Sequence, residues 1–146
     1  MSPSRKQLYQ AAEEFCTAFA SKKSVDDILS YFSTTYEVSA IEYGEPILAP
    51  FLGESFVGPS GLRQYFELIG SLLSYDDATF SEYVVDCEAL KVSVKGRAKF
   101  TWLSTKQSWD ETFTYTLDFD EVMKVVRYQV WADSGAAYLA RKGKLV

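Results

Sequence analysis

Residues 109–119 read WDETFTYTLDF, and this stretch decides the fold. Every second residue from Trp109 onward is large or apolar, and every residue between them is Asp or Thr. Alternation over this length is typical of a β-strand with one buried face. That face nevertheless contains a carboxylate, Glu111, and a phenol, Tyr115. Because buried polar groups need partners from the protein or from a ligand, the strand predicts a pocket lined by a sheet.

The rest of the chain predicts helices first and antiparallel strands last, which is the α+β pattern. Apolar spacing and capping residues favour helices at 4–20, at 25–32, and from about 59 to 73 with an end at 76–77. Further strands are expected at 36–43, 79–87, 90–103 and 122–133. Asp133 is interpreted as the cap of a C-terminal segment, 134–140. The prediction is one domain over residues 1–146, a curved antiparallel sheet packed on three N-terminal helices around a cone-shaped cavity.

The composition indicates a packed domain with a hydrophobic ligand. The chain has 146 residues, of which 47% are hydrophobic and 16% aromatic, enough for a core. Ten Tyr and ten Phe exceed the needs of a plain core and suit a flat, hydrophobic small molecule. The net charge of -5 argues against a nucleic-acid partner, which needs a basic surface.

The sequence contains no histidine, which removes His-based acid–base catalysis, Ser-His-Asp triads and His metal sites. Cys16 and Cys87 lack metal-ligand spacing, so no metal site is expected, and neither requires a disulfide. The N-terminus lacks the apolar core of a signal peptide, and no apolar run reaches membrane-spanning length. These features predict a cytoplasmic protein without a membrane partner.

Three segments resemble the nuclear-transport-factor-2-like superfamily, and within it the SnoaL-like polyketide cyclase branch. They are IEYGEP at 41–46 with PFLGESFVGPSGLRQYF at 50–66, WDETFTYTLDF at 109–119, and MKVVRYQVWAD at 123–133. The resemblance covers roughly residues 8–139. It implies a cystatin-like α+β roll, no metal or organic cofactor, and a homodimer formed through the sheet, whose convex face would carry Trp131.

The resemblance also implies site residues. In ketosteroid isomerase, a superfamily member, a carboxylate base acts beside an oxyanion site of Tyr and protonated Asp. Glu42 falls near that base and Tyr115 near the oxyanion Asp, while Phe15 falls near the oxyanion Tyr and cannot donate a hydrogen bond. Limonene-epoxide-hydrolase-like enzymes use an Asp-Arg-Asp arrangement. Here the matching strand reads GRAK and lacks the Asp, and Val130 falls near the position of the Asp on the last strand of those enzymes.

Glu42 and Tyr115 are therefore the expected catalytic pair. Side chains expected to contact the substrate are Phe15, Tyr43, Tyr65, Trp102, Glu111, Phe113, Tyr128 and Val130. Five of these ten residues have a structural alternative: a solvated strand end for Glu42, a rim carboxylate for Glu111, and core packing for Tyr115, Trp102 and Tyr128. The predicted function is a cofactor-independent cyclase, isomerase or hydrolase of secondary metabolism acting on a hydrophobic polyketide or terpenoid. The alternative is a non-catalytic ligand-binding or dimeric interaction domain.

Overall fold

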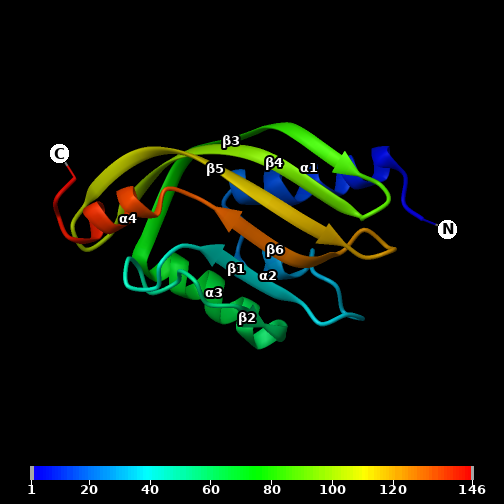
Figure 1. Cartoon of the computed structure of the whole chain (residues 1–146), viewed down its shortest axis with the longest axis horizontal. Coiled ribbons are helices and arrows are strands. Elements are labelled where there is room, and N and C mark those ends of the chain that lie inside the picture. Colours follow the sequence, from blue (N-terminus) through cyan, green and yellow to red (C-terminus); the bar gives the residue numbers. More distant parts are fainter. Residues whose placement is uncertain (1, 146) are drawn as a thin grey trace.

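A computed structural model describes residues 2–145 as helices packed on a six-stranded curved sheet (Figure 1). The helices are α1 (Arg5–Ala20), α2 (Val25–Leu29), α3 (Gly58–Leu72) and α4 (Ser134–Arg141). The strands are β1 (Ser39–Tyr43), β2 (Phe56–Val57), β3 (Leu73–Asp86), β4 (Lys91–Trp102), β5 (Gln107–Phe119) and β6 (Val125–Trp131). The sheet order is β2-β1-β6-β5-β4-β3. The predicted α+β class is confirmed.

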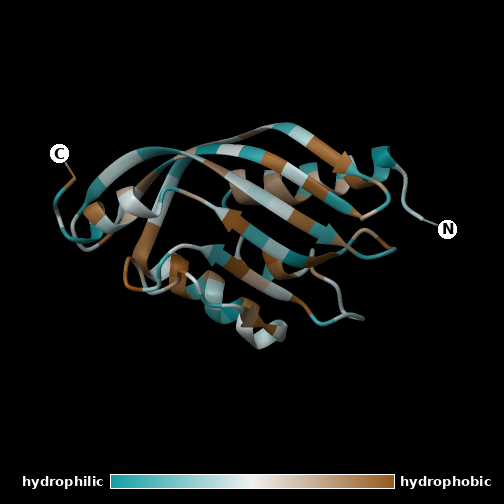
Figure 2. Ribbon diagram, in the orientation of Figure 1, coloured by the Kyte–Doolittle hydropathy of each residue, from teal (hydrophilic) through white to brown (hydrophobic). Residues whose placement is uncertain are grey.

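The β5 strand follows the predicted alternation. Its odd-numbered residues from Trp109 to Phe119 are buried, whereas Asp110 and Thr112 are exposed. Figure 2 shows the same alternation of hydrophobic and hydrophilic residues along the neighbouring strands. One face of the sheet therefore packs against α1 and α3, and the other faces outward.

Gly96 on β4 leaves room for a ring of the buried face. A Cβ at this position would lie 2.3 Å from the Phe113 side chain. The missing side chain therefore lets the Phe113 ring lie across the neighbouring strand. This close approach fixes the position of one wall of the cavity described below.

The largest departure from the predicted elements is at the α3–β3 junction. The helix is predicted to run to about residue 73, with the Asp76-Asp77 pair ending it, and the strand to begin at 79. The helix α3 ends at Leu72, within one residue of the prediction, but β3 begins at Leu73, six residues earlier than predicted. Asp77 does not end the helix. It has a φ of 57° within an irregularity between Asp76 and Thr79, so the strand absorbs the Asp pair as a bulge.

Other boundaries also differ. The second helix ends at Leu29 rather than 32, and the first strand begins at Ser39 rather than 36. That strand pairs in parallel with β6, while the other strand pairs are antiparallel.

The C-terminal segment forms α4, which lies against the end of the sheet in Figure 1. The Asp133 side chain accepts a hydrogen bond from the Ala136 backbone N–H at 2.9 Å, which confirms the predicted cap. Arg141 donates to the carbonyls of Ile47 and Leu48, which ties α4 to the loop after β1. Among residues 2–145, no helix is long and apolar enough to cross a membrane.

Candidate functional site

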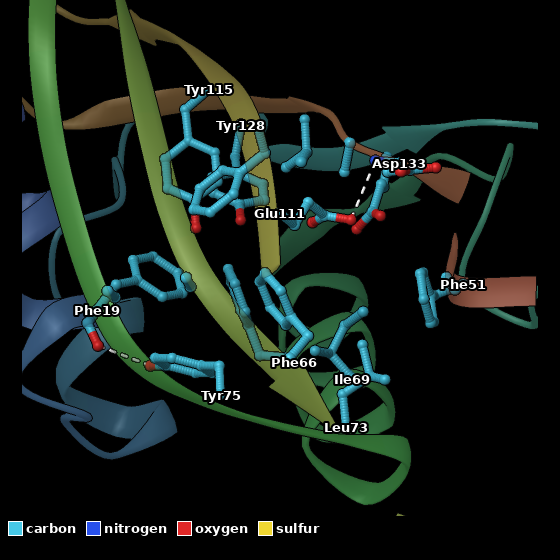
Figure 3. A pocket seen from close by; sticks show the side chains of 18 of the residues that line it. Phe19, Phe51, Phe66, Ile69, Leu73, Tyr75, Glu111, Tyr115, Tyr128 and Asp133 are labelled. Carbon is cyan, nitrogen blue, oxygen red and sulfur yellow. Dashed lines mark hydrogen bonds between the residues drawn. The ribbon is translucent and has the colours of Figure 1, made fainter. Parts of the chain in front are cut away.

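A cavity of about 80 Å³ lies between the sheet and helices α1 and α3 (Figure 3). Eleven of its 21 lining residues are aromatic. Its acidic lining residues are Glu42, Glu111 and Asp133, and none of the lining residues in the described part of the chain is Lys or Arg. The cavity is therefore a mainly apolar space with an acidic polar component.

Glu42 enters the cavity from β1, where it pairs with Val130 of β6. The Tyr65 hydroxyl, from α3, donates a hydrogen bond to Glu42 Oε1 at 3.0 Å. Burial raises the pKa of Glu42 from 4.5 to about 8; the Tyr65 hydrogen bond lowers it in part, and the charge of Glu111 raises it further. This carboxyl group is therefore mostly protonated at neutral pH.

Glu111 enters the cavity from β5, and its carboxyl group accepts two hydrogen bonds, one more than that of Glu42 does. Its Oε1 accepts hydrogen bonds from Trp109 Nε1 at 3.0 Å and from the Asp133 backbone N–H at 3.1 Å. Burial raises the pKa of Glu111 to about 7, these two donors oppose the rise, and the Asp133 charge adds to it. Glu111 therefore loses its proton at a lower pH than Glu42 does.

Three buried phenols line the same cavity. Tyr115 and Tyr128 have ring centroids 4.9 Å apart, and Tyr65 and Tyr128 have centroids 5.9 Å apart. Figure 3 shows the hydroxyls of Tyr115 and Tyr128 side by side, facing into the cavity. Burial, more than any neighbouring group, raises the pKa of all three phenols well above 10. They remain protonated at working pH and can act as hydrogen-bond donors.

The structure brings most of the predicted site residues together at this cavity. Seven of the ten line it: Glu42, Tyr65, Glu111, Phe113, Tyr115, Tyr128 and Val130. They come from α3 and from β1, β6 and β5, which are consecutive in the sheet although β1 is distant in sequence from the other two. Their catalytic and binding roles remain predictions.

Tyr43 does not line the cavity, contrary to expectation. It directly follows Glu42 on β1, and successive side chains of a strand point to opposite faces. Its ring stacks on Trp131 with centroids 4.8 Å apart, and its hydroxyl donates to Gln129 Oε1 at 2.6 Å. Tyr43 therefore belongs to the outer face of the sheet.

Phe15 and Trp102 are core residues rather than cavity residues. Phe15 is fully buried and packs edge-on against the rings of Phe32 and Tyr128. Its role at the cavity is taken by Phe19, one helical turn later. Trp102 is the last residue of β4, two residues after Phe100. Its ring packs against that of Phe51, with centroids 6.4 Å apart.

The prediction missed the wall formed by β3. Tyr75, Ala78 and Phe80 line the cavity from this strand. Their spacing breaks the period of two because the bulge at Asp77 adds one residue between Tyr75 and Phe80. A helical end was expected there, so no residue of this segment was assigned to the site. The sequence signal for a cavity wall in this segment was the presence of apolar residues on both sides of the Asp76-Asp77 pair.

The two carboxyl groups predict a stability that falls as the pH rises. Each group holds its proton to a higher pH in the folded than in the unfolded chain, where the pKa is near 4.5. Their contribution is full below pH 4.5 and is lost as the pH rises through about 7 for Glu111 and about 8 for Glu42. We expect the Tm to fall between acidic and alkaline pH over this window, measured by circular dichroism.

The double variant Glu42→Gln/Glu111→Gln is the control for this effect. Glutamine does not titrate, so the fall of Tm across the window should become shallower. An unchanged slope would assign the pH dependence to other groups.

No protein-family model matches the chain, and no curated protein sequence matches it. Solved structures do. An NTF2-like protein from Burkholderia xenovorans superposes with a TM-score of 0.73 at 18% identity, over 94% of this chain and 97% of that one. The chain has the NTF2-like fold. AusH from Aspergillus nidulans has a TM-score of 0.67 at 20% identity, over 90% of this chain and 87% of its own.

A third NTF2-like match is the BvnE pinacolase from Penicillium brevicompactum, with a TM-score of 0.70 at 15% identity, over 96% of this chain and 94% of that one. At these identities the likeness defines the fold. The chemistry has to be argued from the cavity itself, because one fold carries many functions.

Proposed function

We propose that the protein is a cofactor-independent acid–base enzyme that acts on a hydrophobic, oxygenated small molecule of secondary metabolism. The observation that carries this proposal is the Glu42 carboxyl group, buried in an aromatic cavity and hydrogen-bonded to Tyr65. A carboxyl group with a pKa of about 8 can both give and take a proton near neutral pH.

Glu42 moves the proton in this mechanism. In its protonated form it donates to an oxygen of the substrate, and in its ionised form it removes a proton next to a carbonyl. Tyr115 donates a hydrogen bond to the oxygen on which negative charge develops, and Tyr128 lies beside it. Since both phenols are protonated and surrounded by apolar groups, their hydrogen bonds gain strength from the low local dielectric.

Proteins of the same fold support this reaction class. One is described as an epoxide hydrolase/cyclase-like enzyme, SalBIII, in pyran ring formation in polyether salinomycin. Another, TerC, was co-crystallised with polyporic acid, and a third is the pinacolase BvnE. Cyclisation, isomerisation and hydrolysis all need a positioned proton donor or acceptor, which Glu42 supplies.

The cavity must enlarge to hold such a substrate. Its volume of about 80 Å³ is below the ~300–1,000 Å³ of typical small-molecule pockets. Partly exposed rings at its border, including Tyr75, Phe80 and Phe100, are the side chains that can move. The small volume also favours a second candidate, a module that binds a small hydrophobic ligand without turnover.

A pH–rate profile on a panel of ketone and epoxide substrates tests the enzyme. If protonated Glu42 acts, kcat/KM should fall as the pH rises through about 8. The Tyr65→Phe variant removes a donor that lowers the pKa of Glu42, so the fall should move to higher pH. Binding without turnover across the panel would favour the non-catalytic module, and a fall unmoved by Tyr65→Phe would remove Glu42 from the profile.

We also propose a homodimer through the outer face of the sheet. Trp131 and Tyr43 form a stacked pair there, 44% and 37% exposed. Large exposed aromatic side chains are enriched at protein interfaces. The Trp131→Glu variant should sediment as a monomer, because it places a charge in the proposed contact. Val84→Glu, on the exposed part of β3, is the matched control and should remain dimeric. A dimeric Trp131→Glu variant would contradict this interface.

A further inference from the structure

The Glu111 carboxylate has a free oxygen at the cavity. Both of its hydrogen bonds, from Trp109 and from the Asp133 backbone, end on Oε1, and Oε2 has no partner among the described residues. The side chain is only 8% exposed, yet no deeply buried polar atom of the described chain lacks a partner. Oε2 therefore faces the cavity, where a ligand can reach it.

The cavity that this oxygen faces has no positive charge on its lining within residues 2–145. Glu111 also borders a second hollow with Arg97 and Lys99, but both of these side chains are exposed. None of the residues lining the cavity is Lys or Arg, and the ion pairs of the described chain engage other acids: Asp26, Asp76, Glu82 and Asp118. Glu42 and Asp133 interact with Glu111 through their charges, and the three protonated phenols line the same cavity. An anionic ligand would be repelled by the ionised Glu111 at low dielectric, whereas a cation would be attracted to it.

The aromatic wall favours the same kind of ligand. Trp109 and Phe100 stack beside Glu111, with centroids 5.8 Å apart, and Phe113 and Tyr115 continue the wall along β5. The face of an aromatic ring carries partial negative charge and attracts cations within about 6 Å. A cation at Oε2 would therefore be held by a carboxylate and by ring faces at the same time.

We propose that Glu111 binds a protonated amine of the ligand, which makes hydrophobic amines the preferred substrate class. This inference rests on the proposed function, in which Glu42 acts on the reacting end of the substrate. It adds that Glu111 binds the amine at the other end and so orients the substrate. The ammonium donates one N–H to Oε2, and its remaining N–H groups face the phenol oxygens and the aromatic rings. Carboxylic acids of the same size are excluded by charge.

A matched set of three probes tests this proposal: benzylamine, benzyl alcohol and benzoate. At pH 8 Glu111 is mostly ionised, and the amine is protonated. Calorimetry should show the amine binding roughly 10- to 100-fold more tightly than the alcohol, the range of a hydrogen bond to a charged group. Benzoate should bind most weakly. The Trp109 indole N–H signal in NMR, adjacent to the site, should shift with the amine.

Three variants separate the possible outcomes. Glu111→Gln keeps an acceptor for Trp109 and should lose the preference for the amine while its affinity for the alcohol, a report on cavity integrity, persists. Asp110→Asn removes the same charge from the exposed face of β5 and should keep the preference. Glu42→Gln should also keep it, so a loss of turnover there is independent of this inference. Amine affinity no higher than that of the alcohol, or a preference that survives Glu111→Gln, would overturn the proposal.

Discussion

Replacing Glu42 with glutamine is expected to lower kcat/KM by about 10²–10⁴-fold, the usual effect of removing a positioned acid or base. Glutamine has nearly the same shape and still accepts a hydrogen bond from Tyr65, but it cannot transfer a proton. The measurement is steady-state turnover of any substrate found in the panel, with the wild type assayed beside it.

Glu45→Gln is the matched control, because Glu45 is an exposed carboxylate three residues along the chain. It should retain wild-type turnover. The Glu42 variant should keep its Tm at acidic pH and gain stability relative to the wild type at alkaline pH, since ionised Glu42 opposes folding there. Wild-type turnover in Glu42→Gln would exclude this residue from the mechanism, and a large loss of Tm would identify a structural carboxylate.

Phe15→Ala is expected to lower the free energy of unfolding by about 3–5 kcal/mol, the range for removing a fully buried phenyl ring. The ring contacts Phe19, Tyr31, Phe32 and Tyr128, so its loss leaves a void between α1 and the sheet. Urea denaturation followed by circular dichroism measures the effect.

The companion variant is Phe19→Ala, which removes a ring of the same size that is partly exposed at the cavity. It should lose less stability than Phe15→Ala and should change ligand affinity more. The reverse order would mean that Phe15, as the family resemblance suggested, belongs to the binding site.

Local patterns predicted the features that depend on neighbouring residues in sequence. The alternation of 109–119 identified β5 and the direction of Glu111, Phe113 and Tyr115, and the NTF2-like fold followed from the order of elements. The helical stripe of α1 identified Phe15 and Phe19 as buried but could not tell which of them reaches the cavity. That choice depends on how α1 is placed against β3 and β4, which is a tertiary property.

The remaining features depend on long-range geometry. The second hydrogen-bond donor to Glu111 is the backbone N–H of Asp133, 22 residues away, and no sequence pattern predicts this contact. Tyr43 was assigned to the cavity together with Glu42, although adjacent residues of one strand cannot share a face. The β3 wall was missed because Asp76 and Asp77 were interpreted as a helix end, whereas Asp tolerates the left-handed conformation of a bulge.

The direct passage from α3 to β3 has a consequence for association kinetics. Ile69 on the helix and Leu73 on the strand both border the cavity, and the Leu103 N–H binds the carbonyl of Leu72 between them at 2.9 Å. Without an intervening loop this wall has no hinge, so helix and strand cannot swing apart to admit a molecule. Space has to come from rotation of packed rings, which is a slower, activated step than diffusion. The observed rate constant for binding should then reach a plateau at high ligand concentration. The plateau value equals the rate constant for rotation of the packed rings.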